Sequence, residues 1–149
     1  MSEELAHNFP PETRKPVVGV EPRLRQQALQ DFTIARSKMP FEWGVNDCAL
    51  CAADWVKICT GIDYAAAFRG YTGAREALSL ISTHGGLQAI ATAALGEPVA
   101  SGFETVGDVV LIDFDGNEVL GICNGATTLG PGPNGLVAVT FPVLAAWRF

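Results

Sequence analysis

The feature that most constrains the fold of this chain is a cysteine at the start of an alanine-rich, apolar helix. Residues 41–59 read FEWGVNDCALCAADWVKIC. Asn46 and Asp47 are typical helix N-caps, because their short polar side chains accept hydrogen bonds from first-turn amides. Apolar residues on most sides of residues 48–59 predict a central buried helix. Because a helix N-terminus favours the thiolate, Cys48 lies where a cysteine nucleophile is expected.

Helical periodicity is concentrated in the first two thirds of the chain. From Arg23 the apolar residues recur at helical spacing, and Pro40 ends this segment. Gly61 ends the central helix, and Asp63 predicts a capped short turn after it. Two shorter helices are predicted on either side of a Gly-Gly pair, over residues 74–83 and 87–95.

Strand signals follow in the C-terminal part. Residues 106–114 form a β-branched run, and the turn Asp115-Gly116-Asn117 predicts a hairpin to a second strand at 119–123. Helices first and an antiparallel sheet second predict an α+β fold, with helices packed on a small sheet. Shorter strands are predicted at 126–129, 136–141 and 147–149, with a Gly/Pro-rich loop at 130–135.

The length suits a single domain preceded by an arm. Residues 1–22 contain four prolines and no helical or alternating period, which predicts an extended arm. Two interpretations of this arm stay open: a disordered tail, or a strap that becomes ordered on a neighbouring subunit. Residues 23–149 suit one compact domain, and a composition of 48% hydrophobic and 17% charged residues is that of a globular protein.

Charge and hydropathy narrow the classes of partner. The net charge of −6 argues against a nucleic-acid-binding surface, which needs clustered Lys and Arg. No stretch approaches the roughly 20 apolar residues of a membrane span, and the N-terminus lacks the layout of a signal peptide. We therefore expect a protein that is made in the cytoplasm and is soluble there, without a cofactor.

The other cysteines have a plainer interpretation than Cys48. Disulfides are disfavoured in the cytoplasm, so Cys51, Cys59 and Cys123 are interpreted as buried free thiols. The CxxC spacing of Cys48 and Cys51 is also found in zinc and redox sites. No second CxxC or His pair completes a metal site, so no metal is expected.

Two segments resemble the NlpC-type peptidases, the papain-like cell-wall hydrolases of bacteria and their phages. FEWGVNDCALCAADWV is similar to the WG-x-x-DC signature of that clan, and GDVVLIDF with VLGIC is similar to its GD-[LV]-V-x-F and HVGIY strands. The resemblance covers roughly residues 23–149. It is closer to a branch encoded in tail-gene clusters of phages, prophages and gene transfer agents, which shares HGGL at 84–87 and AWR at 146–148.

This resemblance implies a papain-like fold in which the helix that begins at Cys48 packs on the sheet. It places Cys48 at the nucleophile position and Asp47 at the acidic position before it. The catalytic histidine of the clan corresponds to Val119 here, and the orienting polar residue should lie near Leu129 or Gly130. Both the base and its orienting group are thus missing from the expected positions, which argues against efficient peptide hydrolysis.

The imidazoles of this chain are His7 and His84. His7 lies in the arm. His84 has two interpretations: a helix C-cap beside two glycines, or a catalytic base if its turn approaches Cys48. Trp43 and Asn46 complete the candidate site, Trp43 as a groove-lining side chain and Asn46 beside the cap.

The acidic hairpin turn offers a further alternative. A calcium site or a carboxylate-only hydrolase could be built from its oxygen-bearing side chains, Asp113, Asp115, Asn117 and Glu118. DFDGNE has fewer ligands than an EF-hand loop, which favours a simple turn. Asp108, at the start of the first strand, is expected to hold its loop by hydrogen bonds.

These observations lead to one preferred function and two alternatives. The preferred function is a structural component of a phage-like tail, at its distal end, tip or baseplate, with a degenerate cysteine-peptidase fold. The resemblance implies synthesis in a bacterium, a location in the virion tail, and other tail proteins as partners of the arm. The first alternative is an active cysteine hydrolase of peptidoglycan peptides that uses Cys48, with His84 or a partner's group as base. The second is a cytoplasmic binding domain unrelated to virions.

Overall fold

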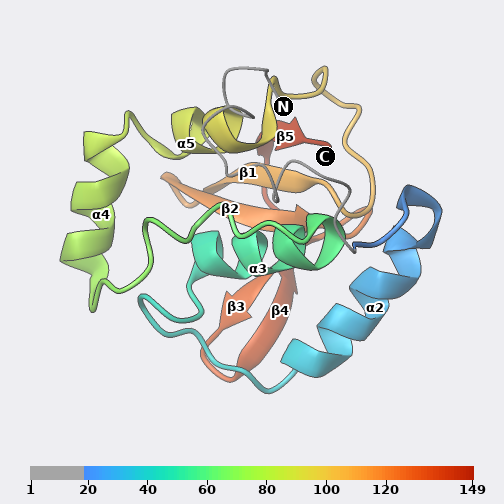
Figure 1. Ribbon diagram of the computed structural model, residues 1–149, viewed down its shortest axis with the longest axis horizontal. Coiled ribbons are helices and arrows are strands. Elements are labelled where there is room, and N and C mark those ends of the chain that lie inside the picture. Colours follow the sequence, from blue (N-terminus) through green and yellow to red (C-terminus); the bar gives the residue numbers. More distant parts are fainter. Residues whose placement is uncertain (1–18) are drawn as a thin grey trace.

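The computed structural model describes residues 19–149, which form four α-helices and a five-stranded antiparallel sheet (Figure 1). The predicted α+β class is confirmed. Residues 1–18, which make up most of the predicted arm and include His7, lie outside the described residues. The helical elements are η2 (Pro22–Leu24), α2 (Arg25–Arg36), α3 (Cys48–Thr60), α4 (Ala74–Thr83) and α5 (Leu87–Leu95). The strands are β1 (Val109–Phe114), β2 (Asn117–Cys123), β3 (Thr128–Gly132), β4 (Gly135–Val139) and β5 (Val143–Trp147).

The helices follow the predicted boundaries closely. α4 and α5 begin and end at the predicted residues, and α3 extends one residue further, to Thr60. Gly61 stops α3 in a left-handed conformation with φ of 79°, where its amide donates to the carbonyl oxygen of Lys57 at 2.7 Å. α2 is shorter than the predicted helix, because residues 37 and 38 form a turn before Pro40.

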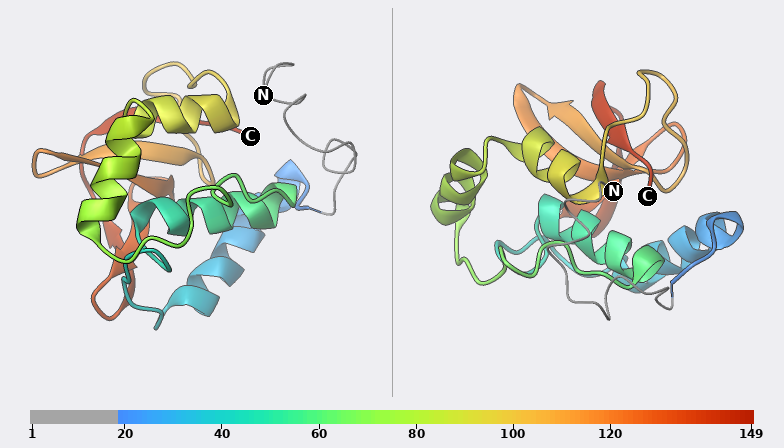
Figure 2. Two further views of the ribbon diagram at one scale, coloured as in Figure 1. Left: turned by 60° about the vertical axis from the view of Figure 1, so that its left-hand side comes forward. Right: turned by 45° about the horizontal axis from the view of Figure 1, so that its top comes forward.

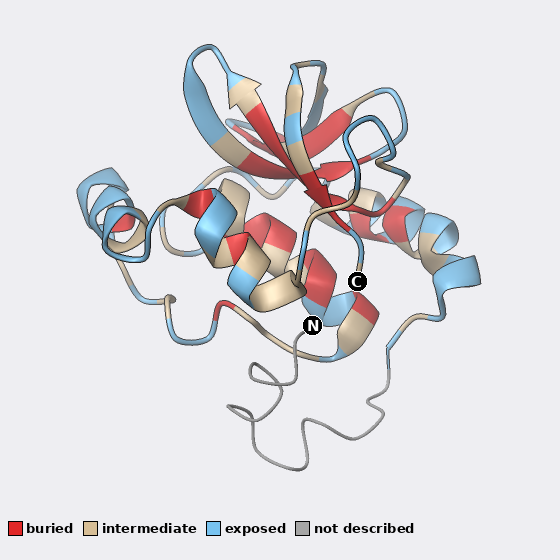
Figure 3. Ribbon diagram, turned by 90° about the horizontal axis from the view of Figure 1, so that it is seen from above, coloured by how far each residue is buried: buried red, intermediate tan, exposed pale blue. Residues whose placement is uncertain are grey.

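α3 is the central element of the core. It lies against the sheet with α2 beside it (Figure 2), and buried residues concentrate along α3 and the middle of the strands (Figure 3). One group of core residues joins α3 to α5, β1 and β2, and a second joins α3 to α2, β2 and β3. Trp55 is fully buried and its indole Nε1 donates to the carbonyl oxygen of Gly107 at 2.8 Å. The predicted buried position of this helix is therefore confirmed.

The sheet has the strand order β4-β3-β2-β1-β5. β1 and β2 pair along their whole length around the turn at Asp115 and Gly116, which have φ of 51° and 88°. β2 and β3, in contrast, pair only at Ile122↔Leu129 and Cys123↔Thr128. β3 and β4 run at a steep angle to β1 and β2 (Figure 1). Beyond these two pairs, β2 and β3 therefore separate.

The sheet curls so that its two edges approach each other. β4 and β5 form opposite edges, yet only residues 140–142 connect them. The inner face of the curl is apolar and contains Val110 and Ile112 of β1, Cys123 of β2 and Ala146 of β5. Such a short link requires a strongly coiled sheet, since a flat one would separate its edge strands by four interstrand spacings of about 4.8 Å each.

The short strands differ from their predicted positions. The predicted strand at 126–129 is found at Thr128–Gly132, so the predicted loop at 130–135 shrinks to the two-residue turn Pro133-Asn134. The last strand runs over Val143–Trp147 and not over 147–149. The glycine- and proline-rich sequence predicts a loop, but β3 pairs with β4 over its entire length.

Two buried side chains, Asp108 before β1 and Trp147 in β5, link the central strands to neighbouring segments. Asp108, which is 3% exposed, accepts from the amide of Thr105 at 2.9 Å and pairs with Arg148 at 2.9 Å. The prediction that Asp108 holds its loop is confirmed. Trp147 is fully buried and donates through Nε1 to the hydroxyl of Thr92 at 3.2 Å.

None of the helices within residues 19–149 has the length and hydropathy that a membrane crossing requires.

Candidate functional site

The loop before α3 is fixed by Asn46. This residue is 2% exposed, and its Nδ2 donates to the carbonyl oxygens of Met39 at 3.3 Å and Pro40 at 3.0 Å. Its Oδ1 accepts from Nη1 of Arg36 at 3.3 Å. These bonds tie the loop to the end of α2, so the backbone enters α3 at Cys48 in a fixed direction.

The carboxylate of Asp47 caps α3. Its Oδ1 accepts from the amide of Leu50 at 3.0 Å, and its Oδ2 accepts from the amide of Gly44 at 3.0 Å and from the hydroxyl of Tyr71. Asp47 is 2% exposed, so these bonds replace its contacts with water. The sequence predicts the cap but not Tyr71, because no local pattern connects residues that lie 24 positions apart.

Cys48 lines a pocket of about 300 Å³ at the place where β2 and β3 separate. Its walls are almost entirely apolar and come from the first turn of α3, from the β1–β2 hairpin, from β3 and β4, and from Phe41 in the loop. The lining residues include Cys48, Ile112, Phe114, Val119, Leu120, Leu129, Pro131, Val137 and Val139. This volume lies at the lower end of the range for small-ligand or side-chain pockets, roughly 300–1,000 Å³.

The three positions that the sequence resemblance singles out lie in this one pocket. Val119, at the histidine position, lines it together with Cys48, and so do Leu129 and Gly130, near the expected orienting residue. The side chains offered to the sulfur from these positions are aliphatic or absent. No imidazole of the described residues lines the pocket.

The Cys48 thiol is protonated at neutral pH. Burial, and to a smaller extent the negative charge of Asp47, raise the pKa of this thiol to about 11, although hydrogen bonding to the backbone lowers it in part. The expectation that the helix start favours the thiolate is therefore wrong. Desolvation of the sulfur and the adjacent carboxylate both favour the neutral thiol, and the backbone hydrogen bond offsets them only in part.

His84 is a helix C-cap on the exposed surface. Its Nδ1 lies 2.8 Å from the carbonyl oxygen of Leu80, to which it donates in the tautomer that carries a proton there, and its ring packs edge-on against Phe68 at 4.9 Å. The structural interpretation of this residue is confirmed. Its imidazole is engaged at the end of α4, and it does not line the pocket of Cys48.

The rim of the pocket is apolar. Phe41 lines the pocket, and Trp43 stacks edge-on against it at a centroid distance of 4.8 Å while remaining 40% exposed. Phe114 and Val137 also line the pocket and are 41% and 42% exposed. Trp43 therefore contributes to the surface beside the pocket rather than to its wall.

Thr128 is a pocket residue that the sequence analysis missed. It is 5% exposed and it lines the pocket. Apart from the Cys48 thiol, this hydroxyl is the one polar side-chain group that the described lining provides. A threonine in a short strand gives no sequence signal that its side chain lines a pocket.

The remaining candidates are structural. Cys51, Cys59 and Cys123 are buried free thiols, as predicted, and burial raises the pKa of Cys51 to about 12 and that of Cys59 to about 11. Asp113 accepts from the amide of Gly116 at 2.7 Å and so closes the hairpin turn.

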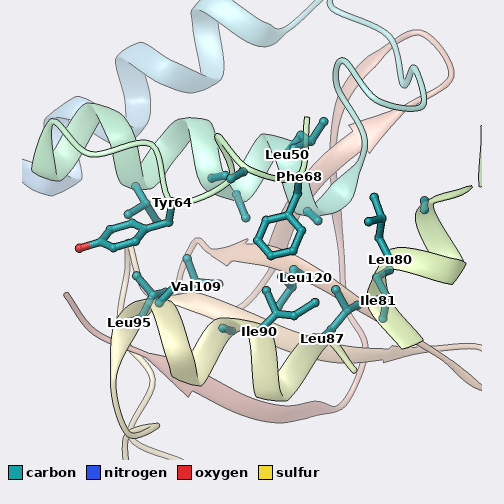
Figure 4. A pocket seen from close by; sticks show the side chains of 18 of the residues that line it. Leu50, Tyr64, Phe68, Leu80, Ile81, Leu87, Ile90, Leu95, Val109 and Leu120 are labelled. Carbon is teal, nitrogen blue, oxygen red and sulfur yellow. The ribbon is translucent and has the colours of Figure 1, made fainter. Parts of the chain in front are cut away.

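A second cavity of about 110 Å³ lies on the other side of α3, between α3, α4, α5 and the segment that contains Tyr64 and Phe68 (Figure 4). Its lining is apolar apart from two tyrosine hydroxyls, and it holds no nucleophile or base among the described residues. Leu120 lines both cavities.

A family model with the description Domain of unknown function (DUF6950) matches residues 22–149. The chain belongs to this family. The DUF6950 match begins at η2 and includes every helix and strand described above, so both cavities lie inside the family domain. No curated protein and no solved structure matches the chain.

Proposed function

We propose that this DUF6950 domain is a structural component of a phage-like tail, built on a degenerate papain-like fold that binds a partner and does not cleave it. The protein is made in the bacterial cytoplasm and assembled at the distal end, tip or baseplate of the tail. Other tail proteins are its partners, with the N-terminal arm as a contact.

The main support for a domain without catalytic activity is the environment of Cys48. A cysteine hydrolase needs a thiolate, a base that removes the proton, and a group that orients the base. Here the sulfur shares its pocket with Val119 and Leu129, and its pKa is raised to about 11. General-base assistance accounts for about 10²–10⁴-fold in rate, so its loss removes most of the activity.

Two features support a binding role. The tail assignment is drawn from the resemblance of the WGxxDC helix, the HGGL segment and the C-terminal AWR to a tail-cluster branch. The pocket itself has a rim of exposed large apolar residues, namely Trp43, Phe114 and Val137. Exposed apolar side chains around a pocket are typical of protein-binding sites.

Purified phage-like particles provide the test of this proposal. Mass spectrometry of particles from the host strain should detect the full chain at a fixed number of copies per tail, and a strain lacking the gene should produce defective tails. The purified full chain should release no more fragments from peptidoglycan than its Cys48→Ala variant. Absence from intact particles would exclude the tail role, and cleavage that depends on Cys48 would establish the hydrolase instead.

A further inference from the structure

One edge of β2 has no neighbouring strand among the described residues over positions 117–121. On its other edge β2 pairs with β1 along its whole length. Toward β3 it pairs only at Ile122↔Leu129 and Cys123↔Thr128, and β3 runs at a steep angle to it (Figure 1). We call residues 117–121 on this side the free edge of β2. An unpaired strand edge is a template on which a further extended chain can pair.

The register shows which backbone groups point outward from the free edge. The amide of Asp113 donates to the carbonyl oxygen of Pro142 at 3.0 Å, so it is not bonded to Glu118, which lies opposite Asp113 in β2. In an antiparallel pair, hydrogen-bonded and non-hydrogen-bonded positions alternate. The N–H and C=O groups of Glu118 and Leu120 therefore point away from β1, toward the free edge, whereas those of Val119 point toward β1.

The pocket of Cys48 lies along the free edge. Val119 and Leu120 line it from β2, and residues 130–132 line it from β3. Because side chains of a strand alternate between the two faces, a strand added next to β2 would place every second side chain on the face of Val119. The pocket on that face is apolar and has a volume of about 300 Å³. An apolar side chain therefore suits the position opposite Val119.

The other face of the free edge is acidic. Glu118 lies directly opposite Asp113, and the ion pairs in the described part of the chain involve neither carboxylate. The sequence contains no Lys or Arg between Arg75 and Arg148. Like charges at directly opposed positions destabilise a strand pair. A Lys or Arg side chain of an added strand, placed beside Glu118, would offset this repulsion.

We propose that the free edge of β2 binds an extended segment of a partner protein, in which an apolar residue is followed directly by Lys or Arg. The segment adds to the sheet as an antiparallel strand, the direction found in every strand pair of this sheet. Its apolar side chain occupies the pocket of Cys48, opposite Val119. The next residue then lies opposite Glu118, which pairs with the cation.

The backbone and the side chains of such a segment have separate roles. Main-chain bonds to Glu118 and Leu120 give affinity, and the apolar and cationic side chains give specificity. This inference rests on the proposed binding role of the same pocket and names the chemistry of the partner.

Two capped peptides test the recognised sequence. The full chain is titrated at low salt with the peptide TVTLKVT and with its matched variant TVTLEVT, while the NMR signals of the Glu118 and Leu120 amides are followed. TVTLKVT should give saturable shifts at both amides and bind more tightly than TVTLEVT by roughly fivefold or more. Equal binding of the two peptides, or no saturable binding of TVTLKVT, would overturn the proposal.

Charge variants of the protein test the location. In Glu118→Gln the preference for TVTLKVT should fall to roughly twofold, because one of the two opposed carboxylates is removed. Glu97→Gln is the matched control, since Glu97 is exposed, lies outside the hairpin and should leave the preference unchanged. Stronger binding of both peptides to Glu118→Gln would overturn the proposal, because Glu118 would then only block the edge.

Backbone methylation tests strand addition itself. In the proposed register the Lys amide of the peptide donates to the carbonyl oxygen of Glu118, whereas the Leu amide points away from β2. TVTLKVT with N-methylated Lys should bind more weakly by roughly tenfold or more, and N-methylated Leu should change binding by less than about threefold. Equal effects of the two methyl groups would overturn strand addition.

The outcomes also separate this inference from the tail role and from self-association. If particles contain the chain but TVTLKVT does not bind, this inference fails and the tail role stands. If TVTLKVT binds but particles lack the chain, the tail role fails and recognition at β2 stands. Concentration-dependent association of the chain alone, lost in Glu118→Gln, would place a second copy on the free edge and overturn the proposal.

Discussion

The carboxylate of Asp47 both caps α3 and acts on the thiol beside it. Its bonds to Leu50, Gly44 and Tyr71 fasten the helix start, and its negative charge adds to the burial that keeps Cys48 protonated. An active thiol at this position would need an imidazole to offset these effects. The neighbouring β2 offers Val119 at that place.

Introducing the missing imidazole is a direct test at the residue scale. Val119→His should lower the pKa of Cys48 and increase its alkylation by iodoacetamide at neutral pH, because a nearby imidazolium stabilises the thiolate. In the unmodified chain, alkylation of Cys48 should rise with pH and reach no plateau below its pKa of about 11. Mass spectrometry of the alkylated peptide at several pH values provides the measurement.

Val137→His is the matched control, because Val137 lines the same pocket from β4. It adds the same group to the pocket but not at the histidine position, so a smaller effect is expected. A plateau near neutral pH in the unmodified chain would contradict the protonated state of Cys48. Equal effects of the two variants would contradict the special position of residue 119.

At the scale of single residues, the sequence predicts roles within one helical turn but not contacts between residues that lie far apart in the chain. The cap by Asp47 and the C-cap by His84 depend on residues within one helical turn, and both are found as predicted. Tyr71 and Thr128 enter the two sites through tertiary contacts that no local spacing encodes. The raised pKa of Cys48 likewise depends on burial, which appears only in the folded chain.

Among the elements, the short pairing between β2 and β3 determines where the pocket lies. The strands pair at two positions and then separate, and Gly121 lies directly beside this short pairing. A Cβ at Gly121 would lie 2.4 Å from Cγ2 of Thr128 and 2.9 Å from the carbonyl oxygen of Leu129. Only a residue without a side chain lets β3 approach so closely.

Gly121→Ala should therefore destabilise the domain by about 1–3 kcal/mol, through overpacking against β3. Adding Thr128→Ser should recover part of this loss, because it removes the Cγ2 methyl group. Gly130→Ala is the control, since a Cβ there meets nothing within 4 Å and the backbone at that glycine is not left-handed. Urea unfolding measures all of these variants, and equal stability of the Gly121 and Gly130 variants would contradict the close approach.

The helices were predictable because their periodicity, caps and terminating glycines agree with one another. β3 was not, because its sequence, TLGPG, contains the residues that usually mark a loop. Pro131 is tolerated in it because β2 no longer pairs with β3 at that position, so its missing amide removes no bond to β2. Local composition cannot reveal that the neighbouring strand has already separated.

At the scale of the whole molecule, an ion pair between the buried carboxylate of Asp108 and Arg148 links the start of β1 to the end of β5. Asp108 precedes β1, and Arg148 follows β5 and also donates to the carbonyl oxygen of Phe103 at 2.8 Å. The sequence predicts that Asp108 holds a loop but does not indicate its partner 40 residues away. The order of helices and strands similarly predicts an α+β domain but not the closure of the sheet.

Arg148→Ala should lower the free energy of unfolding by about 1–3 kcal/mol, because it leaves the Asp108 carboxylate buried with fewer hydrogen bonds. Arg23→Ala is the control. Arg23 pairs with Glu21, and both side chains are largely exposed (76% and 65%), so a change of less than about 0.5 kcal/mol is expected. Urea unfolding at neutral pH compares the two variants, and a similar loss in both would show that the pairing of Arg148 with the buried Asp108 carboxylate adds no extra stability.

Residues 140–142 are too short a link to let the two edges of the sheet move independently. Val137 and Val139 on β4 could shift outward only if β5 moved too, and β5 is hydrogen-bonded to β1 in the centre of the molecule. The pocket beside Cys48 should therefore have nearly the same shape before and after a partner binds. A partner that seats an apolar side chain there would meet little conformational entropy cost, and the free and bound domains should superpose closely.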